Sequence, residues 1–258
     1  MITDLSLLLI ILLGFISTTL GSALVFFSKK ELSEKNEAIF LGFAAGVMIA
    51  ASIWSLLIPA LEESKELGKL SFIPPAVGFL LGALFLVAID HLVPHMHLSG
   101  EEEGPECKLS RNSRLFLAMS IHNFPEGLAV GFALGDYLSR GLDPSPAFAI
   151  ALAMAIQNIP EGAAISLPLS KEKGKLKAFL SGSASSIAEP LSALLGIFLS
   201  SILSPLSPYL LSFSAGAMIF VVAEDLIPES KIEEHPHHGA LALVAGFLVM
   251  MVLDVSLG

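Results

Sequence analysis

The sequence predicts an all-α polytopic membrane protein, and three observations carry this prediction. The chain of 258 residues is 54% hydrophobic and 15% charged, with a mean hydropathy of +0.78, whereas soluble domains carry about 25% charged residues. Its apolar residues gather in runs of roughly 20, the length that an α-helix needs to cross a bilayer. The runs are continuously apolar and lack the alternation of membrane-barrel strands, so helices are left as the way to satisfy the backbone in lipid.

Eight transmembrane helices are predicted, within a single domain over residues 1–258. The spans cover approximately residues 5–27, 38–61, 72–92, 114–135, 147–169, 178–200, 205–227 and 239–257. The first span lacks the basic segment that opens a signal peptide, so we interpret it as retained. The single cysteine, Cys107, excludes a disulfide framework within the chain. The net charge of −10 offers no basic patch for nucleic acid.

Basic residues in the loops orient these spans. If the N-terminus lies outside, the inner loops hold 11 of the 14 lysines and arginines, and the outer loops hold the other 3, Lys65, Lys69 and Arg140. Cytoplasmic loops of membrane proteins carry the excess of positive charge. We therefore predict that both termini lie on the extracytoplasmic side.

A polar motif occurs twice, in the middle of two consecutive spans. The fourth span contains I-H-N-F-P-E-G at residues 121–127, and the fifth contains I-Q-N-I-P-E-G at residues 156–162. Because consecutive spans cross the membrane in opposite directions, the two copies are antiparallel. Pro125 and Pro160 cannot donate a backbone hydrogen bond, so each leaves a carbonyl exposed within its helix.

The polar side chains of the two copies predict a metal site near the middle of the membrane. Residues four apart share one helix face, and residues three apart border it. The six side chains are His122, Asn123, Glu126, Gln157, Asn158 and Glu161. A charged residue at the bilayer centre costs at least about 2.5–3.5 kcal/mol, and no lysine or arginine lies deep in any span. Nitrogen and oxygen donors together favour zinc and its first-row neighbours, whereas magnesium and calcium favour oxygen alone.

Other polar residues of the spans and loops extend this hypothesis. Glu189 adds a carboxylate in the sixth span, and a further set lies near span ends and in the third loop: Asp90, His91, His95, His97, Glu224 and Asp225. Solvation at the interface is the simpler explanation for Asp90 and Asp225. At the outer face, Glu62, Glu63 and Asp254 form either an acidic entrance that attracts cations or a plain solvated rim. Polar residues also join membrane helices, which is the alternative role for the amides.

Internal similarity predicts an inverted repeat around the two motif spans. In the second span, Leu41, Phe43, Ala45, Gly46, Met48 and Ile49 match Leu211, Phe213, Ala215, Gly216, Met218 and Ile219 of the seventh. Ile58-Pro59 then aligns with Ile227-Pro228 after a slip of one residue. Spans 1–3 and 6–8 would form inverted repeats that flank spans 4 and 5, an arrangement common in secondary transporters. Chance recurrence of small residues in apolar helices is the alternative.

The sequence resembles the ZIP (Zrt-, Irt-like) family of divalent metal transporters, in particular its bacterial GufA-like branch. The resemblance covers all eight spans and rests on H-N-F-P-E-G, Q-N-I-P-E-G, A-E-P-L at residues 188–191 and E-D-L-I-P-E at residues 224–229. It implies a single ZIP-type domain that moves zinc, with cadmium, iron and manganese as alternatives, into the cytoplasm across the inner membrane. It also implies a homodimer in which spans 1, 4, 5 and 6 move against the other four.

The same resemblance implies roles for individual residues. His122, Glu126, Gln157 and Glu161 would bind the transported metal, with Met48 beside them, although composition alone makes Met48 a packing residue. Asn123, Asn158 and Glu189 would form a second site for an adjacent ion and share Glu126 and Glu161 with the first. Glu224 would lie on the release route, together with Asp90 and His91, and His95 and His97 would receive the metal near the exit. Many relatives outside this branch have histidine at the position of Gln157, so the ligand set predicted here is more neutral.

Two other functions were weighed against transport by alternating access. An intramembrane zinc hydrolase is disfavoured because the chain contains no H-E-x-x-H and no span carries two histidines four residues apart. The chain is therefore expected not to be an enzyme. A proton-coupled carrier for another solute would use the two motif glutamates as proton relays, and metal binding at these glutamates distinguishes the two hypotheses.

Overall fold

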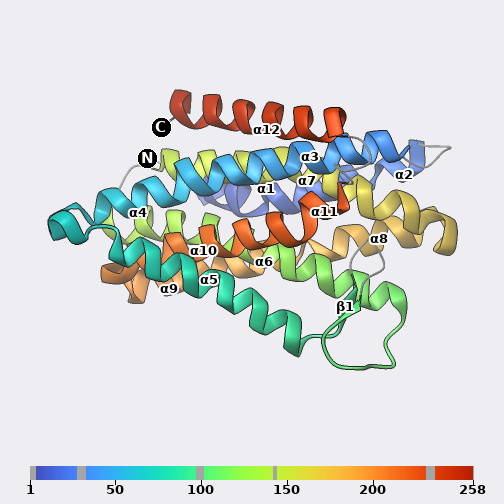
Figure 1. The fold of residues 1–258 in the computed structure, drawn as a ribbon, viewed down its shortest axis with the longest axis horizontal. Coiled ribbons are helices and arrows are strands. Elements are labelled where there is room, and N and C mark those ends of the chain that lie inside the picture. The colour runs from blue at the N-terminus through green and yellow to red at the C-terminus, as the bar shows by residue number, and fades with distance from the viewer. Residues whose placement is uncertain (1–3, 28–32, 97–101, 142–143, 231–235, 258) are drawn as a thin grey trace.

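The computed structural model describes residues 4–27, 33–96, 102–141, 144–230 and 236–257. Its longer helices lie side by side in one bundle (Figure 1). The helical elements are α1 (Asp4–Ser22), α2 (Leu24–Phe27), α3 (Glu34–Ala51), η1 (Ser52–Leu57), α4 (Ile58–Glu63), η2 (Lys65–Leu70), α5 (Ile73–Leu92), α6 (Arg111–Arg140), α7 (Ser145–Lys173), α8 (Lys175–Ser185), α9 (Ala188–Ile202), η3 (Ser204–Leu206), α10 (Ser207–Val221), η4 (Val222–Leu226), α11 (Ile227–Glu229) and α12 (Pro236–Leu257). Two short antiparallel strands, β1 (His95–Met96) and β2 (Glu102–Glu103), form a hairpin.

Seven helical stretches of the described residues are long and apolar enough to cross a membrane, which confirms the predicted polytopic, all-α class. They are residues 5–27, 34–63, 73–92, 145–171, 175–202, 207–226 and 237–256. The predicted fourth span corresponds to α6, which is long enough but falls outside this set because its polar residues lower its hydropathy. The count of eight spans stays a prediction.

The two ends of the bundle differ in what they carry. Both termini and α4 lie at one end, which we call the terminal end, and the β1–β2 hairpin lies at the other, the hairpin end (Figure 1). Because both termini lie at one end, the chain crosses the bundle an even number of times. This arrangement agrees with α6 as a further crossing.

Local sequence signals define the limits of α6, the longest helix among the described residues. The hydroxyl of Ser110 accepts a hydrogen bond from the backbone N–H of Ser113 (3.2 Å) and caps the first turn. Gly141 ends the helix in the left-handed region, at φ +66°. The helix of 30 residues therefore places its motif near the middle, far from either end.

The second and seventh predicted spans each contain a π-helical segment at the same relative place. The segment η1 directly precedes Ile58-Pro59, and η4 directly precedes Ile227-Pro228. A proline cannot donate to the carbonyl four residues before it, so a local change of helical period upstream of each proline is physically reasonable. The first segment has 6 residues and the second has 5, which accounts for the one-residue slip in the sequence match.

The closest helix contacts pair α6 with α9, α1 with α7, α3 with α12 and α5 with α10. We call α1, α6, α7, α8 and α9, which include both motif helices, the motif group, and α3, α5, α10 and α12 the frame group. A Cβ added at Gly162 of α7 would lie 2.3 Å from the Thr18 carbonyl oxygen of α1, and one added at Gly46 of α3 would lie 1.9 Å from that of Leu243 in α12. Among the described residues, each helical glycine that approaches another helix this closely does so within its own group. Across the interface between the two groups, the described helices make no glycine contact this close.

Matched contacts within the two groups are those that the predicted inverted repeat requires. Gly46 of α3 faces α12, and its counterpart Gly216 of α10 faces α5. Gly162 of α7 faces α1, and its counterpart Gly127 of α6 faces α9. The pair formed by spans 2 and 8 is thus equivalent to the pair formed by spans 7 and 3. In the same way, the pair formed by spans 5 and 1 is equivalent to the pair formed by spans 4 and 6. The repeat itself stays a prediction that these contacts support.

Candidate metal centre

Polar side chains from three helices of the motif group meet in the interior of the bundle. They are His122, Asn123 and Glu126 of α6, Gln157, Asn158 and Glu161 of α7, and Glu189 of α9, and we call them the central cluster. All seven are at most 5% exposed. The two copies of the motif therefore face a shared interior, as their spacing predicts.

Hydrogen bonds run through the central cluster from α6 to α9. The Nε2 of Gln157 donates to Oε1 of Glu126 (2.5 Å) and to Oδ1 of Asn158 (2.9 Å). The Nδ2 of Asn158 donates in turn to Oε1 of Glu189 (2.7 Å). The two amides thus occupy the space between two carboxylates and link the two motif copies directly.

No lysine or arginine lies near the carboxylates of the central cluster in the sequence of their helices. No lysine or arginine occurs between residues 115 and 139, 141 and 170, or 178 and 230. Glu126 and Glu161 each interact electrostatically with Glu189, so like charges lie close together. Two buried carboxylates with like charge nearby cannot both stay ionised without a cation.

Several buried oxygens of the central cluster have no hydrogen-bond donor among the described residues. They are Oε2 of Glu126, Oε1 of Gln157 and Oδ1 of Asn123. Nearly all buried polar atoms in native proteins have a partner, and an unpaired one calls for an explanation such as an ion. These acceptors belong to three side chains on two adjacent helices, as the ligands of one cation do.

Asp225 joins the centre and corrects the expectation that it is solvated at a span end. It is 4% exposed, and its Oδ2 lies 3.0 Å from Nε2 of His122. Glu224, which the sequence analysis preferred as a release-route residue, is exposed and lines a cavity towards the hairpin end. The sequence does not indicate whether Glu224 or Asp225 points inwards, because the π-helical period of η4 decides this.

Two methionines lie near the motif helices, and the structure distinguishes them. Met48 of α3 is fully buried in the apolar core. The thioether of Met154 contacts the central cluster: its Sδ lies 3.7 Å from Nε2 of Gln157. Met154 precedes Gln157 by three residues, so a face-by-face reading of α7 could have identified it.

A second group of candidate ligands lies at the hairpin end. The side chains of Asp90, His95 and Glu103 offer ligand atoms that all lie within 4.8 Å of one another. Nε2 of His95 is 3.5 Å from Oδ1 of Asp90 and 3.7 Å from Oε2 of Glu103. The pairing of β1 with β2 sets His95 opposite Glu103, and His95 is only 1% exposed. Solvation therefore does not explain this histidine.

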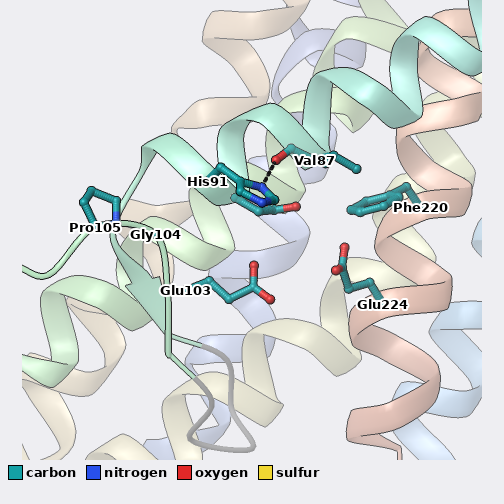
Figure 2. A pocket seen from close by; sticks show the side chains of 8 residues that line it. Val87, His91, Glu103, Gly104, Pro105, Phe220 and Glu224 are labelled. Carbon is teal, nitrogen blue, oxygen red and sulfur yellow. Dashed lines mark hydrogen bonds between the residues drawn. The ribbon is translucent and has the colours of Figure 1, made fainter.

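A cavity of about 370 Å³ opens beside this group. The carboxylates of Glu103 and Glu224 point into it from opposite sides (Figure 2). His91 lines the same cavity and its Nδ1 lies 2.7 Å from the carbonyl oxygen of Val87. Asp90 also lines it and interacts electrostatically with His122 and Asp225, so acidic groups continue from the central cluster to this cavity. His97 lies outside the described residues.

The acids predicted for the outer entrance are mostly engaged with partners. Glu62 pairs with Lys65 on the surface (3.0 Å), and Glu63 pairs with Arg140 of α6 (3.0 Å). Asp254 of α12 accepts hydrogen bonds from the hydroxyl of Ser55 (2.7 and 2.8 Å). Ser55 and Glu63 line a cavity of about 210 Å³ at this end.

Comparisons with known proteins identify a family. The sequence model described as ZIP zinc transporter matches residues 110–254. The zinc transporter ZIP11 of Xenopus tropicalis is 38% identical, with 93% of this chain and 94% of that protein aligned. The zinc transporter ZIPB of Bordetella bronchiseptica is 39% identical over 95% of this chain and 79% of its own length. The zinc transporter GufA of Myxococcus xanthus is 36% identical over 96% and 97%.

Proposed function

The chain belongs to the ZIP family of zinc transporters, and on that premise we propose that it carries divalent metal ions, zinc first, into the cytoplasm through the central cluster. One observation supports this site above the others. Buried acceptor oxygens on Glu126, Gln157 and Asn123 lack donors among the described residues, and the stretches that carry the acids contain no lysine or arginine. A divalent cation supplies both the missing charge and the missing partner.

The donors divide naturally between two adjacent ions. His122, Glu126, Gln157 and Glu161 provide one nitrogen and several oxygens for the first, which suits zinc. Asn123, Asn158 and Glu189 add oxygens for a second ion that shares Glu126 and Glu161. Gln157 now donates its N–H to Glu126, so its amide must turn to offer Oε1 to a metal. Binding of the ion and rotation of Gln157 are therefore coupled.

Release follows the line of acids towards the hairpin end. Asp225 lies beside His122, and Asp90 is the next acid towards the hairpin. Asp90, His95 and Glu103 would then receive the ion and pass it to the cavity that Glu224 lines. Met48 would lie beside the first ion, as the family resemblance implies. Glu62 and Asp254 remain weaker candidates, since Glu62 has a lysine partner and Asp254 a serine partner.

The orientation and movement of the protein complete the proposal. Basic residues concentrate in the loops of the hairpin end, so this end would face the cytoplasm. Both termini would then lie on the extracytoplasmic side of the inner membrane. Alternating access would slide the motif group against the frame group, because the close glycine contacts of the described helices join helices of the same group. We further propose that residues 1–258 act as one domain and that the protein works as a homodimer.

Zinc uptake into proteoliposomes tests the function. We expect Glu126→Ala and Glu161→Ala to reduce the uptake rate at least about 100-fold, because each removes a shared ligand of a site that lacks spare charge. Glu66→Ala, which removes an exposed acid of η2, serves as the control and should transport normally. Glu126→Gln keeps the side-chain shape and guards against loss of folding, which size-exclusion chromatography monitors. Undiminished uptake in the Glu126 and Glu161 variants would refute the proposal.

A further inference from the structure

The side chain of Glu189 occupies a notch in the surface of α1. A Cβ added at Gly14 would lie 1.7 Å from Oε2 of Glu189 and 3.1 Å from Nδ2 of Asn158. Both distances are shorter than ordinary van der Waals contact, and the first is impossible. Any residue other than glycine at position 14 must therefore displace this carboxylate.

Thr18, one helical turn after Gly14, faces the same carboxylate. Its Oγ1 lies 3.4 Å from Oε1 of Glu189 and 3.2 Å from the carbonyl oxygen of Gly14, so the hydroxyl can donate to either acceptor. The same Oε1 accepts from Nδ2 of Asn158 at 2.7 Å. Thr18 and Glu189 are 1% and 4% exposed, so water does not compete for these contacts.

Gly14 differs from the glycines that serve helix packing. The atoms nearest an added Cβ at Gly21 and at Gly162 are backbone carbonyl oxygens, those of Ile159 and Thr18. The nearest atom at Gly14 is an oxygen of an ionisable side chain. Gly21 and Gly162 therefore allow α1 and α7 to pack closely together. Gly14 instead leaves room for the carboxylate of Glu189.

We propose that Gly14 and Thr18 are positioning residues for Glu189 and thereby determine the affinity of the second metal subsite. Gly14 admits the carboxylate between α1 and α7, and Thr18 with Asn158 fixes its Oε1. With Oε1 fixed, the carboxylate of Glu189 is held in one orientation for a divalent cation shared with Glu126 and Glu161. Groups that orient a metal ligand typically change metal affinity by about 10- to 100-fold when removed. This inference rests on the proposed metal function of the central cluster.

Titration calorimetry of zinc binding to the purified chain of residues 1–258 in detergent tests the positioning role. The wild type should bind two ions at the central cluster, and Glu189→Ala should lose the second. Gly14→Ala should lower the affinity for the second ion by about 10- to 100-fold and leave the affinity for the first ion unchanged. Thr18→Val should weaken it in the same direction, whereas Thr18→Ser should restore wild-type affinity because it keeps the hydroxyl.

A double-mutant cycle separates positioning from packing. In the Glu189→Ala background, Gly14→Ala should have no further effect on zinc binding and no cost in thermal stability, because the clashing oxygen is gone. Equal zinc affinity in Gly14→Ala and the wild type, or stability losses from the two substitutions that simply add, would overturn the positioning role while leaving the proposed function intact. A wild type that binds no zinc at the central cluster would overturn both.

Discussion

Glu126 and Asp136 lie ten residues apart on α6, and both are buried, yet their surroundings differ in kind. Asp136 has a donor for each oxygen: Ser200 contacts Oδ1 (2.9 Å) and Ser207 contacts Oδ2 (2.6 Å). Arg140 adds a positive charge 3.7 Å from Oδ1. Glu126 has one amide donor on Oε1, no hydrogen-bond donor on Oε2 among the described residues, and another carboxylate nearby.

We interpret this difference as the difference between a structural acid and the proposed metal-binding acid. Asp136 is satisfied by its own protein, so its burial stabilises the terminal end of the bundle, where it joins α6 to α9 and α10. Glu126 lacks such satisfaction, which is what the proposed role as a metal ligand predicts. Burial alone would have marked both residues as functional. The completeness of partners distinguishes them, and each of the following predictions tests this distinction.

Matched isosteric substitutions should give the largest contrast in stability. We expect Asp136→Asn to lower the free energy of unfolding by about 2–3 kcal/mol, because hydrogen bonds to a charged acceptor contribute about 1.5–3 kcal/mol. Glu126→Gln removes a buried charge whose Oε2 has no donor among the described residues, so it should change stability by less than about 1 kcal/mol or raise it. Unfolding in detergent measures both values. A larger loss for Glu126→Gln than for Asp136→Asn would contradict the distinction.

Zinc should stabilise only through the central cluster. At a free zinc concentration of about 100 times the dissociation constant, the bound ion adds about 2.7 kcal/mol to the unfolding free energy. Asp136→Asn should retain this gain relative to its own metal-free state, and Glu126→Ala should lose it. The thermal unfolding temperature with and without zinc gives the comparison. A full gain in Glu126→Ala would place the stabilising zinc elsewhere.

The ion pair between Glu63 and Arg140 should have the smallest effect. Arg140 is 35% exposed at its side chain, so solvent screens the pair. Glu63→Gln should therefore lower stability by less than about 1 kcal/mol. Exchange of the two charges, Glu63→Arg with Arg140→Glu, should recover most of the lost stability. If the exchanged variant is less stable than Glu63→Gln, the two residues do not act as a simple ion pair.

The sequence predicted the helical class and the members of the central cluster because these follow from composition and helical spacing. Apolar run length marks the spans, and the four-residue spacing sets His122 beside Glu126 and Gln157 beside Glu161. The antiparallel order of the two copies then brings them together. The direct hydrogen bond between Gln157 and Glu126 is consistent with this reasoning.

Features that depend on helix period or on contacts between distant segments escaped prediction. The π-helical segment η4 turns Asp225 inwards and Glu224 outwards, and no propensity marks such a segment in advance. The pairing of His95 with Glu103 depends on a two-residue strand pair that is too short to leave a pattern. The notch at Gly14 arises only when α9 meets α1, more than 170 residues apart in sequence.

Anomalous X-ray scattering at the zinc edge, from crystals soaked in zinc, tests the central claim most directly. We predict a peak between α6 and α7, within coordination distance of Glu126 and Glu161, with a second peak beside Glu189. Glu126→Ala crystals grown and soaked in the same way should lose the first peak. Zinc found only beside Asp90, His95 and Glu103, with none at the central cluster of the wild type, would contradict the account.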